Sequence, residues 1–177
     1  MNYKVPFYSL LTLGIIGSIA FGPRVIEGLK LKKDKKNTYA IQNVQTGRCI
    51  RPYNAGFEEE NKVILYDLKN WECITWQFIH LEDNTYLLKD LYTEKTFEPV
   101  SDPEEGVTMW QKTLGSSKWQ QWEFIKQVDN IYQIRLKGTE LYLEPAADEL
   151  NANIVLKPLQ KDSTAQEWKL IEQHPIV

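Results

Sequence analysis

The sequence predicts an all-β domain made of three similar repeats around a pseudo-threefold axis, preceded by an N-terminal hydrophobic segment. A tryptophan recurs every 46 residues, at Trp76, Trp122 and Trp168. Around each of them apolar residues alternate with other residues, which is typical of half-buried strands, and no stretch after residue 37 carries a helical stripe. A single repeat would leave its apolar face and its strand edges uncovered, whereas three repeats that close a barrel share one core.

The overall composition is that of a globular protein, but its charge is unevenly distributed. The 177 residues suffice for one domain with an appendage, and 42% are hydrophobic and 25% charged. The net charge is −3, yet residues 1–36 carry seven basic and two acidic residues, while residues 37–177 carry 14 basic and 22 acidic residues. The acidic part has no basic patch for phosphate groups, which argues against nucleic acid as a partner.

Residues 1–21 are predicted to be a signal peptide or a membrane anchor. Residues 5–21 are uncharged, which fits one short membrane crossing. Ser18 and Ala20 are small residues of the kind that a signal peptidase reads, which favours cleavage after Ala20 and a secreted or cell-surface protein. Read as a stop signal, the basic cluster that follows predicts instead an anchor that keeps the domain on the cytoplasmic side. Residues 22–37 form a basic tether, and membrane contact is expected only through this N-terminal segment.

The three repeats span about residues 38–80, 85–126 and 131–172, followed by a tail at 173–177. Each begins with a tyrosine (Tyr39, Tyr86 and Tyr132), and a large apolar residue follows eleven positions later. In each repeat we expect four short strands, about twelve in all, separated by turn residues such as Thr46-Gly47 and Gly115-Ser116-Ser117. Periodic apolar positions are core positions. The residues expected to fill the core are Ile50, Phe97, Leu143, Trp76, Trp122 and Trp168.

Two short motifs give the repeats a likeness to a known family. Gln-x-Trp occurs as Gln120-Gln121-Trp122 and Gln166-Glu167-Trp168, and the first repeat departs from it with Ile74-Thr75-Trp76. A Cys-Leu-Asp segment is echoed in Cys49-Ile50-Arg51, Thr96-Phe97-Glu98 and Tyr142-Leu143-Glu144. With these motifs, residues 38–172 resemble the ricin-type β-trefoil lectin domains. The resemblance implies a β-trefoil fold and carbohydrate binding without catalysis.

The resemblance also implies a disulfide bridge in the first repeat. Cys49 matches the first cysteine of the family, while Cys73 lies later than the usual second one. A bridge would close a loop of about 25 residues and contribute roughly 3 to 3.5 kcal/mol. Two buried free thiols are the alternative, and they are favoured if the domain is cytoplasmic.

The second repeat matches the family's sugar site best. The resemblance places a carboxylate at Glu98, a stacking aromatic ring at Trp110 and the amide of Gln-x-Trp at Gln120, with Thr108 and Trp119 at two further positions of the site. An aromatic face stacks on the apolar face of a sugar ring, and a carboxylate binds hydroxyl groups with the help of its charge. In the alternative interpretation, Gln120 only ties down a loop and Glu98 is a solvated acid.

The other two repeats are weaker candidates for sugar binding. The first has the aromatic residue Tyr66, but Arg51 replaces the acid and Ile74 the amide. The third has the acid Glu144 and the amide Gln166, but Lys157 replaces the aromatic residue. We therefore expect little sugar binding at either of them.

The predicted function is that of an exported carbohydrate-binding module for a cell-surface or polysaccharide glycan, with no cofactor and no metal. The alternative is a protein-interaction β-trefoil, such as a secreted toxin subunit resembling those of cytolethal distending toxins, with degenerate sugar sites and with exposed aromatic residues such as Trp71 and Trp119 as contacts. Catalysis is not expected, because only His80 and His174 are present as histidines and no catalytic sequence motif occurs.

Overall fold

The computed structural model describes residues 36–175. The predicted signal peptide or anchor, most of the tether and the end of the tail lie outside this range. None of the helices within it has the length and apolar character needed to cross a bilayer.

The domain consists of twelve strands and four short 3₁₀ helices, which confirms the all-β prediction. Each repeat supplies four strands. The first repeat contains β1 (Thr38–Asn43), β2 (Arg48–Pro52), β3 (Val63–Asp67) and β4 (Trp76–Glu82), with η1 (Tyr53–Ala55) and η2 (Glu72–Ile74). The second contains β5 (Thr85–Asp90), β6 (Thr96–Pro99), β7 (Met109–Lys112) and β8 (Trp122–Val128), with η3 (Lys118–Gln120). The third contains β9 (Ile131–Leu136), β10 (Leu141–Pro145), β11 (Ile154–Pro158) and β12 (Glu167–Glu172), with η4 (Thr164–Gln166).

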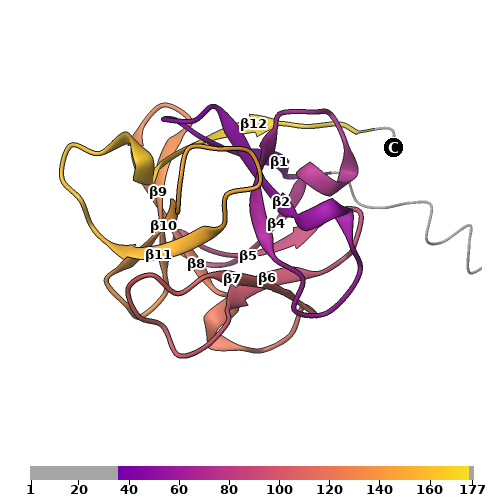
Figure 1. Cartoon of the computed structure of the whole chain (residues 1–177), viewed down its shortest axis with the longest axis horizontal. Coiled ribbons are helices and arrows are strands. Elements are labelled where there is room, and N and C mark those ends of the chain that lie inside the picture. The colour runs from indigo at the N-terminus through magenta and orange to yellow at the C-terminus, as the bar shows by residue number, and fades with distance from the viewer. Residues whose placement is uncertain (1–35, 176–177) are drawn as a thin grey trace, which may run out of the picture. The chain divides into compact units, whose positions relative to one another are not determined.

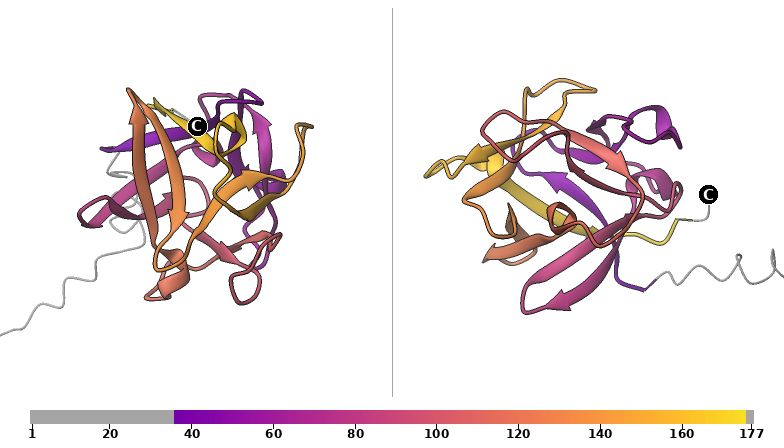
Figure 2. Two further views of the ribbon diagram at one scale, coloured as in Figure 1. Left: turned by 90° about the vertical axis from the view of Figure 1, so that its left-hand side faces the viewer. Right: turned by 90° about the horizontal axis from the view of Figure 1, so that it is seen from below.

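Six of the strands form a closed antiparallel barrel. The first and last strands of each repeat pair in the cyclic order β1, β4, β5, β8, β9 and β12, and β12 pairs again with β1. The β1–β12 contact places the first and last strands of the domain side by side (Figures 1 and 2). Closure leaves the barrel without an open sheet edge, which removes the uncovered edges that a single repeat would have.

The remaining six strands form three hairpins, β2–β3, β6–β7 and β10–β11. One hairpin comes from each repeat, between the two barrel strands of that repeat. A six-stranded barrel with three hairpins related by a pseudo-threefold axis is the β-trefoil arrangement expected from the repeats.

The core lies where the barrel and the hairpins meet. The residues expected there are all at most 1% exposed: Ile50, Phe97, Leu143, Trp76, Trp122 and Trp168. Phe97 lies between two of the tryptophans, with ring centroids 5.2 Å from Trp76 and 5.1 Å from Trp122. Equivalent positions of the three repeats therefore pack on one another and share a single core.

The cysteines correct the sequence prediction of a disulfide. Cys49 and Cys73 are free thiols, and both are buried in a small apolar cluster with Ala40 and Ile74. In this setting each cysteine packs as a small hydrophobic residue. Burial raises the pKa of the Cys49 thiol to about 12, because the charged thiolate is poorly solvated there.

We expect both thiols to be unreactive toward a thiol-specific reagent such as DTNB in the folded protein at mildly alkaline pH. The thiolate is the reacting species, and burial disfavours it. After unfolding in guanidinium chloride without reductant, the two thiols of each chain should react fully. A chain that shows no reactive thiol even after unfolding would instead contain the bridge.

Candidate functional site

The carboxylate of Glu98 in the second repeat is held in place by the amide of Gln120. The Gln120 nitrogen donates to Glu98 Oε2 at 3.0 Å and to the Thr113 carbonyl at 3.1 Å. Its oxygen accepts from the Gly115 amide at 2.8 Å. Gln120 is 3% exposed, and these contacts use both of its polar atoms. The structure therefore places the Gln120 amide inside the protein, where it orients Glu98 and does not face a ligand.

The third repeat has the same arrangement. The Gln166 nitrogen donates to Glu144 Oε2 at 3.0 Å and to the Pro158 carbonyl at 2.8 Å, and its oxygen accepts from Gln160 N at 2.9 Å. Gln166 is fully buried. The Gln-x-Trp glutamine thus has one structural role in both repeats, which is to fix a half-buried carboxylate at the end of a hairpin strand.

What distinguishes the second repeat is the residue across the hairpin. In the β6–β7 hairpin Glu98 lies directly opposite Trp110. Directly opposed residues in an antiparallel pair have side chains on the same face, about 4.5–5.5 Å apart at Cβ. Both side chains are half-buried. The structure thus brings a fixed carboxylate and an aromatic ring together on one surface, which is the pair that the sequence predicted.

The other two hairpins do not form this pair, because their register differs from the sequence alignment of the repeats. In the first repeat Arg51 lies opposite Ile64, and Tyr66 lies opposite Cys49. In the third repeat Glu144 lies opposite Val155, and Lys157 lies opposite Tyr142. Tyr66 and Lys157 are therefore displaced by two residues from the place that Trp110 occupies. The sequence equivalence of Tyr66, Trp110 and Lys157 is corrected accordingly.

Local contacts also make the first and third repeats unsuited to binding a sugar. The Arg51 guanidinium carbon lies 4.3 Å from the centre of the Tyr66 ring, so it covers one face of that ring. Lys157 forms an ion pair with Glu105 of the second repeat at 3.2 Å. Tyr66 thus has one aromatic face covered, and Lys157 extends toward an acidic loop.

Two further predicted site residues lie close to the Glu98–Trp110 pair in sequence but differ in their setting. Trp119 packs partly against the main core, and the Lys118 amine lies 4.2 Å from the centre of its ring. Thr108 is half-buried and forms an isolated bridge with Val155 of the third repeat. Thr108 lies two residues before Trp110, so in this extended segment the two side chains point to the same side.

Charged residues of β7 and of the first repeat lie beside Trp110, and sequence spacing did not indicate them. The Lys112 amine lies 5.4 Å from the centre of the Trp110 ring and forms an ion pair with Glu60 at 3.0 Å. Lys62 forms an isolated antiparallel β-bridge with Trp110 through backbone groups. The Glu58-Glu59-Glu60 run of the first repeat contacts the second repeat through pairs that are distant in sequence, such as Glu59 with Thr113 and Glu60 with Lys112.

Among the charged residues near Trp110, Glu59 has a strongly lowered pKa. Hydrogen bonds from Lys95 and Thr113 to its side chain lower the pKa of Glu59 to about 2. Its neighbour Glu60 contributes a backbone hydrogen bond, in which the Glu60 amide donates to the Gln111 carbonyl at 2.9 Å. The loop of the first repeat is thereby fastened to β7, the strand that carries Trp110.

The described residues offer no arrangement for metal chemistry. Within 36–175, no three His, Cys, Asp or Glu side chains are grouped so that they would hold a metal ion. The candidate site therefore consists of a fixed carboxylate, an aromatic ring and neighbouring polar groups, an arrangement suited to binding a polar ligand with an apolar face.

No family model and no curated protein sequence matches the chain. Solved structures do resemble it. The designed threefold-symmetric protein ThreeFoil aligns with a TM-score of 0.72 at 19% identity, over 76% of this chain and 98% of its own length. An exo-β-1,3-galactanase from Clostridium thermocellum aligns with a TM-score of 0.72 at 15% identity, over 77% of this chain but 30% of the enzyme. The ricin B-like lectin of Macrolepiota procera, determined with lactose, gives a TM-score of 0.65 at 17% identity, over 78% and 95% of the two chains.

At such low identities the likeness concerns the fold. The chain has the β-trefoil fold of the ricin-type lectins, as the repeats and the Gln-x-Trp motifs predicted. The similarity to the galactanase covers less than a third of that enzyme and carries no activity to this chain.

Proposed function

We propose that the domain is a carbohydrate-binding module without catalytic activity, and that it binds a glycan through the β6–β7 hairpin. The observation that carries the proposal is the pair of Glu98 and Trp110, which lie directly opposite each other, with the Glu98 carboxylate fixed by Gln120. A sugar ring stacked on Trp110 would present hydroxyl groups to a carboxylate that is already oriented. Pre-orientation reduces the entropy lost on binding. The ricin-type lectin fold supports the same function.

Glycan-array screening of the full chain, followed by calorimetry with the best ligand, tests this proposal. Because the full chain includes the uncharged residues 5–21, it is kept in detergent. A polyoxyethylene detergent is chosen, since it contains no sugar that would compete for the site. We expect Trp110→Ala and Glu98→Gln each to weaken binding by more than about tenfold, since each removes a stacking face or a charge-assisted hydrogen bond.

Glu144→Gln is the matched control. Glu144 is held by Gln166 as Glu98 is held by Gln120, but it has Val155 and no aromatic ring opposite. This variant should bind the glycan as the unchanged protein does. A blank result across a broad array, or an equal loss in Glu144→Gln, would contradict the proposal.

A second candidate function is protein interaction, as in a subunit of a multi-part secreted toxin. Exposed aromatic residues favour it: Phe57 is 53%, Tyr92 43% and Trp71 40% exposed. Phe57 and Tyr92 are in contact, with ring centroids 4.8 Å apart. This surface does not include the Glu98–Trp110 pair, so a blank glycan array would favour this second candidate.

We further propose that the domain is exported, and that residues 1–21 act as its signal peptide or membrane anchor. The uncharged run in residues 5–21 and the basic residues after it support this proposal. An exported domain would face the cell-surface or polysaccharide glycans that the proposed site suits.

A further inference from the structure

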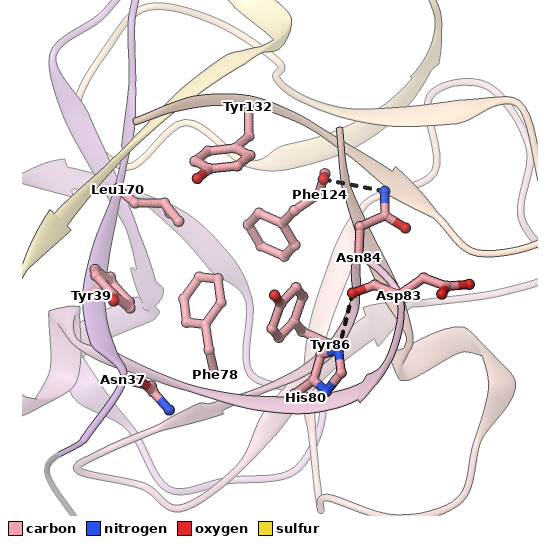
Figure 3. Close-up of a pocket in the computed structure, with 10 residues that line it drawn as sticks. All are labelled: Asn37, Tyr39, Phe78, His80, Asp83, Asn84, Tyr86, Phe124, Tyr132 and Leu170. Atoms are coloured by element: carbon pink, nitrogen blue, oxygen red, sulfur yellow. Dashed lines mark hydrogen bonds between the residues drawn. The ribbon is translucent and has the colours of Figure 1, made fainter. Parts of the chain in front are cut away.

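The barrel has a cavity at the end where the β4–β5 turn lies, and the proposed glycan site does not use it. Its volume is about 420 Å³, which lies in the range of small-molecule sites. We call it the barrel-end pocket. It is lined by Asn37, Tyr39, Phe78, His80, Asp83, Asn84, Tyr86, Phe124, Tyr132 and Leu170 (Figure 3).

The pocket lies on the pseudo-threefold axis, because its lining comes from equivalent positions of the three repeats. Tyr39, Tyr86 and Tyr132 are the first tyrosines of their repeats, and all three are half-buried. Phe78 and Phe124 are equivalent to each other and are 8% and 4% exposed. Leu170 takes their position in the third repeat. Five aromatic side chains therefore surround one opening, three as walls and two as a deeper floor.

The backbone around the opening repeats the same threefold pattern. The carbonyl groups of three asparagines accept from the amides of the floor residues. Asn37 accepts from Phe78 at 2.9 Å, Asn84 from Phe124 at 2.9 Å and Asn130 from Leu170 at 3.0 Å. The floor side chains are thus anchored at the backbone, so the pocket is a formed feature of the barrel end.

The aromatic rings contact one another at angles that make a cage. Tyr39 meets Phe78 at 80° with centroids 5.3 Å apart, and Tyr86 meets Phe124 at 89° and 5.6 Å. Tyr132 meets Phe124 at 72° and 6.0 Å. Walls nearly perpendicular to the floor expose ring faces and edges from several directions. Aromatic faces carry negative electrostatic potential, which attracts cations.

The charges of the lining favour a cation over an anion. No lysine or arginine is among the ten lining residues, and His80 is the one lining side chain that can carry a positive charge. Asp83 supplies a carboxylate, which points away from the rings in Figure 3. It therefore contributes a negative field at the rim without acting as a direct ligand.

Two polar side-chain groups of the lining already have partners within the protein. The Asn84 amide donates to the Phe124 carbonyl at 3.2 Å, and His80 Nε2 lies 3.0 Å from the Asp83 carbonyl (Figure 3). A sugar needs several directional hydrogen bonds to its hydroxyl groups. A quaternary ammonium group needs none, and it gains from every aromatic face that surrounds it.

We propose that the barrel-end pocket binds a quaternary ammonium group, such as the trimethylammonium end of choline. Free choline-type molecules and the headgroup of phosphatidylcholine share this chemistry. The three tyrosines enclose the cation from the sides, and Phe78 and Phe124 close the pocket beneath it. The proposal is independent of the glycan site, because no residue is common to the two.

Titration of the full chain with choline tests the proposal, in a polyoxyethylene detergent that contains no ammonium group. Choline should bind with an upfield shift of its methyl proton resonances, which reports on aromatic ring faces. The neutral isostere 3,3-dimethylbutan-1-ol has the same shape without the charge, and we expect it to bind at least about tenfold more weakly. Equal binding of the two compounds, or no binding of choline, would overturn the proposal.

Variants localise the binding. Tyr86→Leu keeps an apolar side chain but removes a ring, and it should weaken choline binding about tenfold. Tyr132→Leu serves the same purpose if Tyr86→Leu does not fold. Tyr92→Leu, outside the pocket, and Glu98→Gln, in the glycan site, should leave the affinity unchanged. Unchanged affinity in both pocket variants would overturn the assignment.

Reconstitution into vesicles distinguishes the two sources. If the natural ligand is a lipid headgroup, choline binding should be competed away in phosphatidylcholine vesicles and retained in phosphatidylglycerol vesicles. Retention in both would support a free choline-type molecule as the ligand. Loss in both would overturn the proposal, because phosphatidylglycerol has no quaternary ammonium group.

Discussion

Replacing Phe97 by alanine is expected to destabilise the domain by about 3–5 kcal/mol, the range for large aromatic residues in a well-packed core. Phe97 is fully buried and contacts the rings of Trp76 and Trp122. Its removal leaves a cavity where two repeats meet, and the barrel walls around it restrict collapse. Urea unfolding followed by tryptophan fluorescence measures the change.

Phe57→Ala is the matched control for this substitution. Phe57 is 53% exposed and lies in a loop, so the same change in side chain should alter the free energy of unfolding by no more than about 0.5 kcal/mol. A similar loss in both variants would show that the barrel centre does not carry the stability assigned to it.

Replacing Trp168 by phenylalanine is expected to destabilise the domain more than the same change at Trp122. The Trp168 indole nitrogen donates to the Leu143 carbonyl at 3.0 Å, and Trp76 makes the equivalent bond to Ile50 at 3.0 Å. Within residues 36–175 the buried Trp122 indole nitrogen has no hydrogen-bond partner. The change at Trp168 leaves a buried carbonyl group unpaired, whereas the change at Trp122 removes an unpaired donor.

Because the two rings are equally buried, the difference between the variants isolates the indole hydrogen bond. We expect Trp168→Phe to exceed Trp122→Phe by about 1–3 kcal/mol, the penalty for a buried unsatisfied polar group. Equilibrium denaturation of both variants side by side measures it. Trp76→Phe should behave as Trp168→Phe does. Equal losses at Trp122 and Trp168 would contradict this account.

The fold was predictable because the core repeats with the chain. Ile50, Phe97 and Leu143 recur at nearly equal spacing, and core positions of a symmetric barrel must be apolar in every repeat. The pairing of Glu98 with Gln120 was predictable in the same way, from motifs. Whether Gln120 faces a ligand or the protein interior was not, because that depends on the loop carbonyl and amide groups around it.

The remaining features depend on register and on contacts between repeats. In the first repeat Tyr66 lies two residues away from Ile64, the residue that pairs with Arg51. Sequence spacing does not reveal this difference in register. The barrel-end tyrosines were read only as the starts of repeats. Their convergence follows from barrel closure, which brings Tyr39, Tyr86 and Tyr132 together from positions far apart in the chain.

The pairing of β1 with β12 also determines when the domain can complete its folding. Thr38 and Gln173, which are 135 positions apart, are joined by a hydrogen bond of 2.7 Å between the Thr38 hydroxyl and the Gln173 carbonyl. A ribosome must therefore release almost the whole domain before the barrel closes, and contacts this distant in sequence form slowly. During synthesis the sheet has open edges at β1 and β9 that await the last strand. Closure is thus a late step of folding, because it has to wait until β12 has been synthesised.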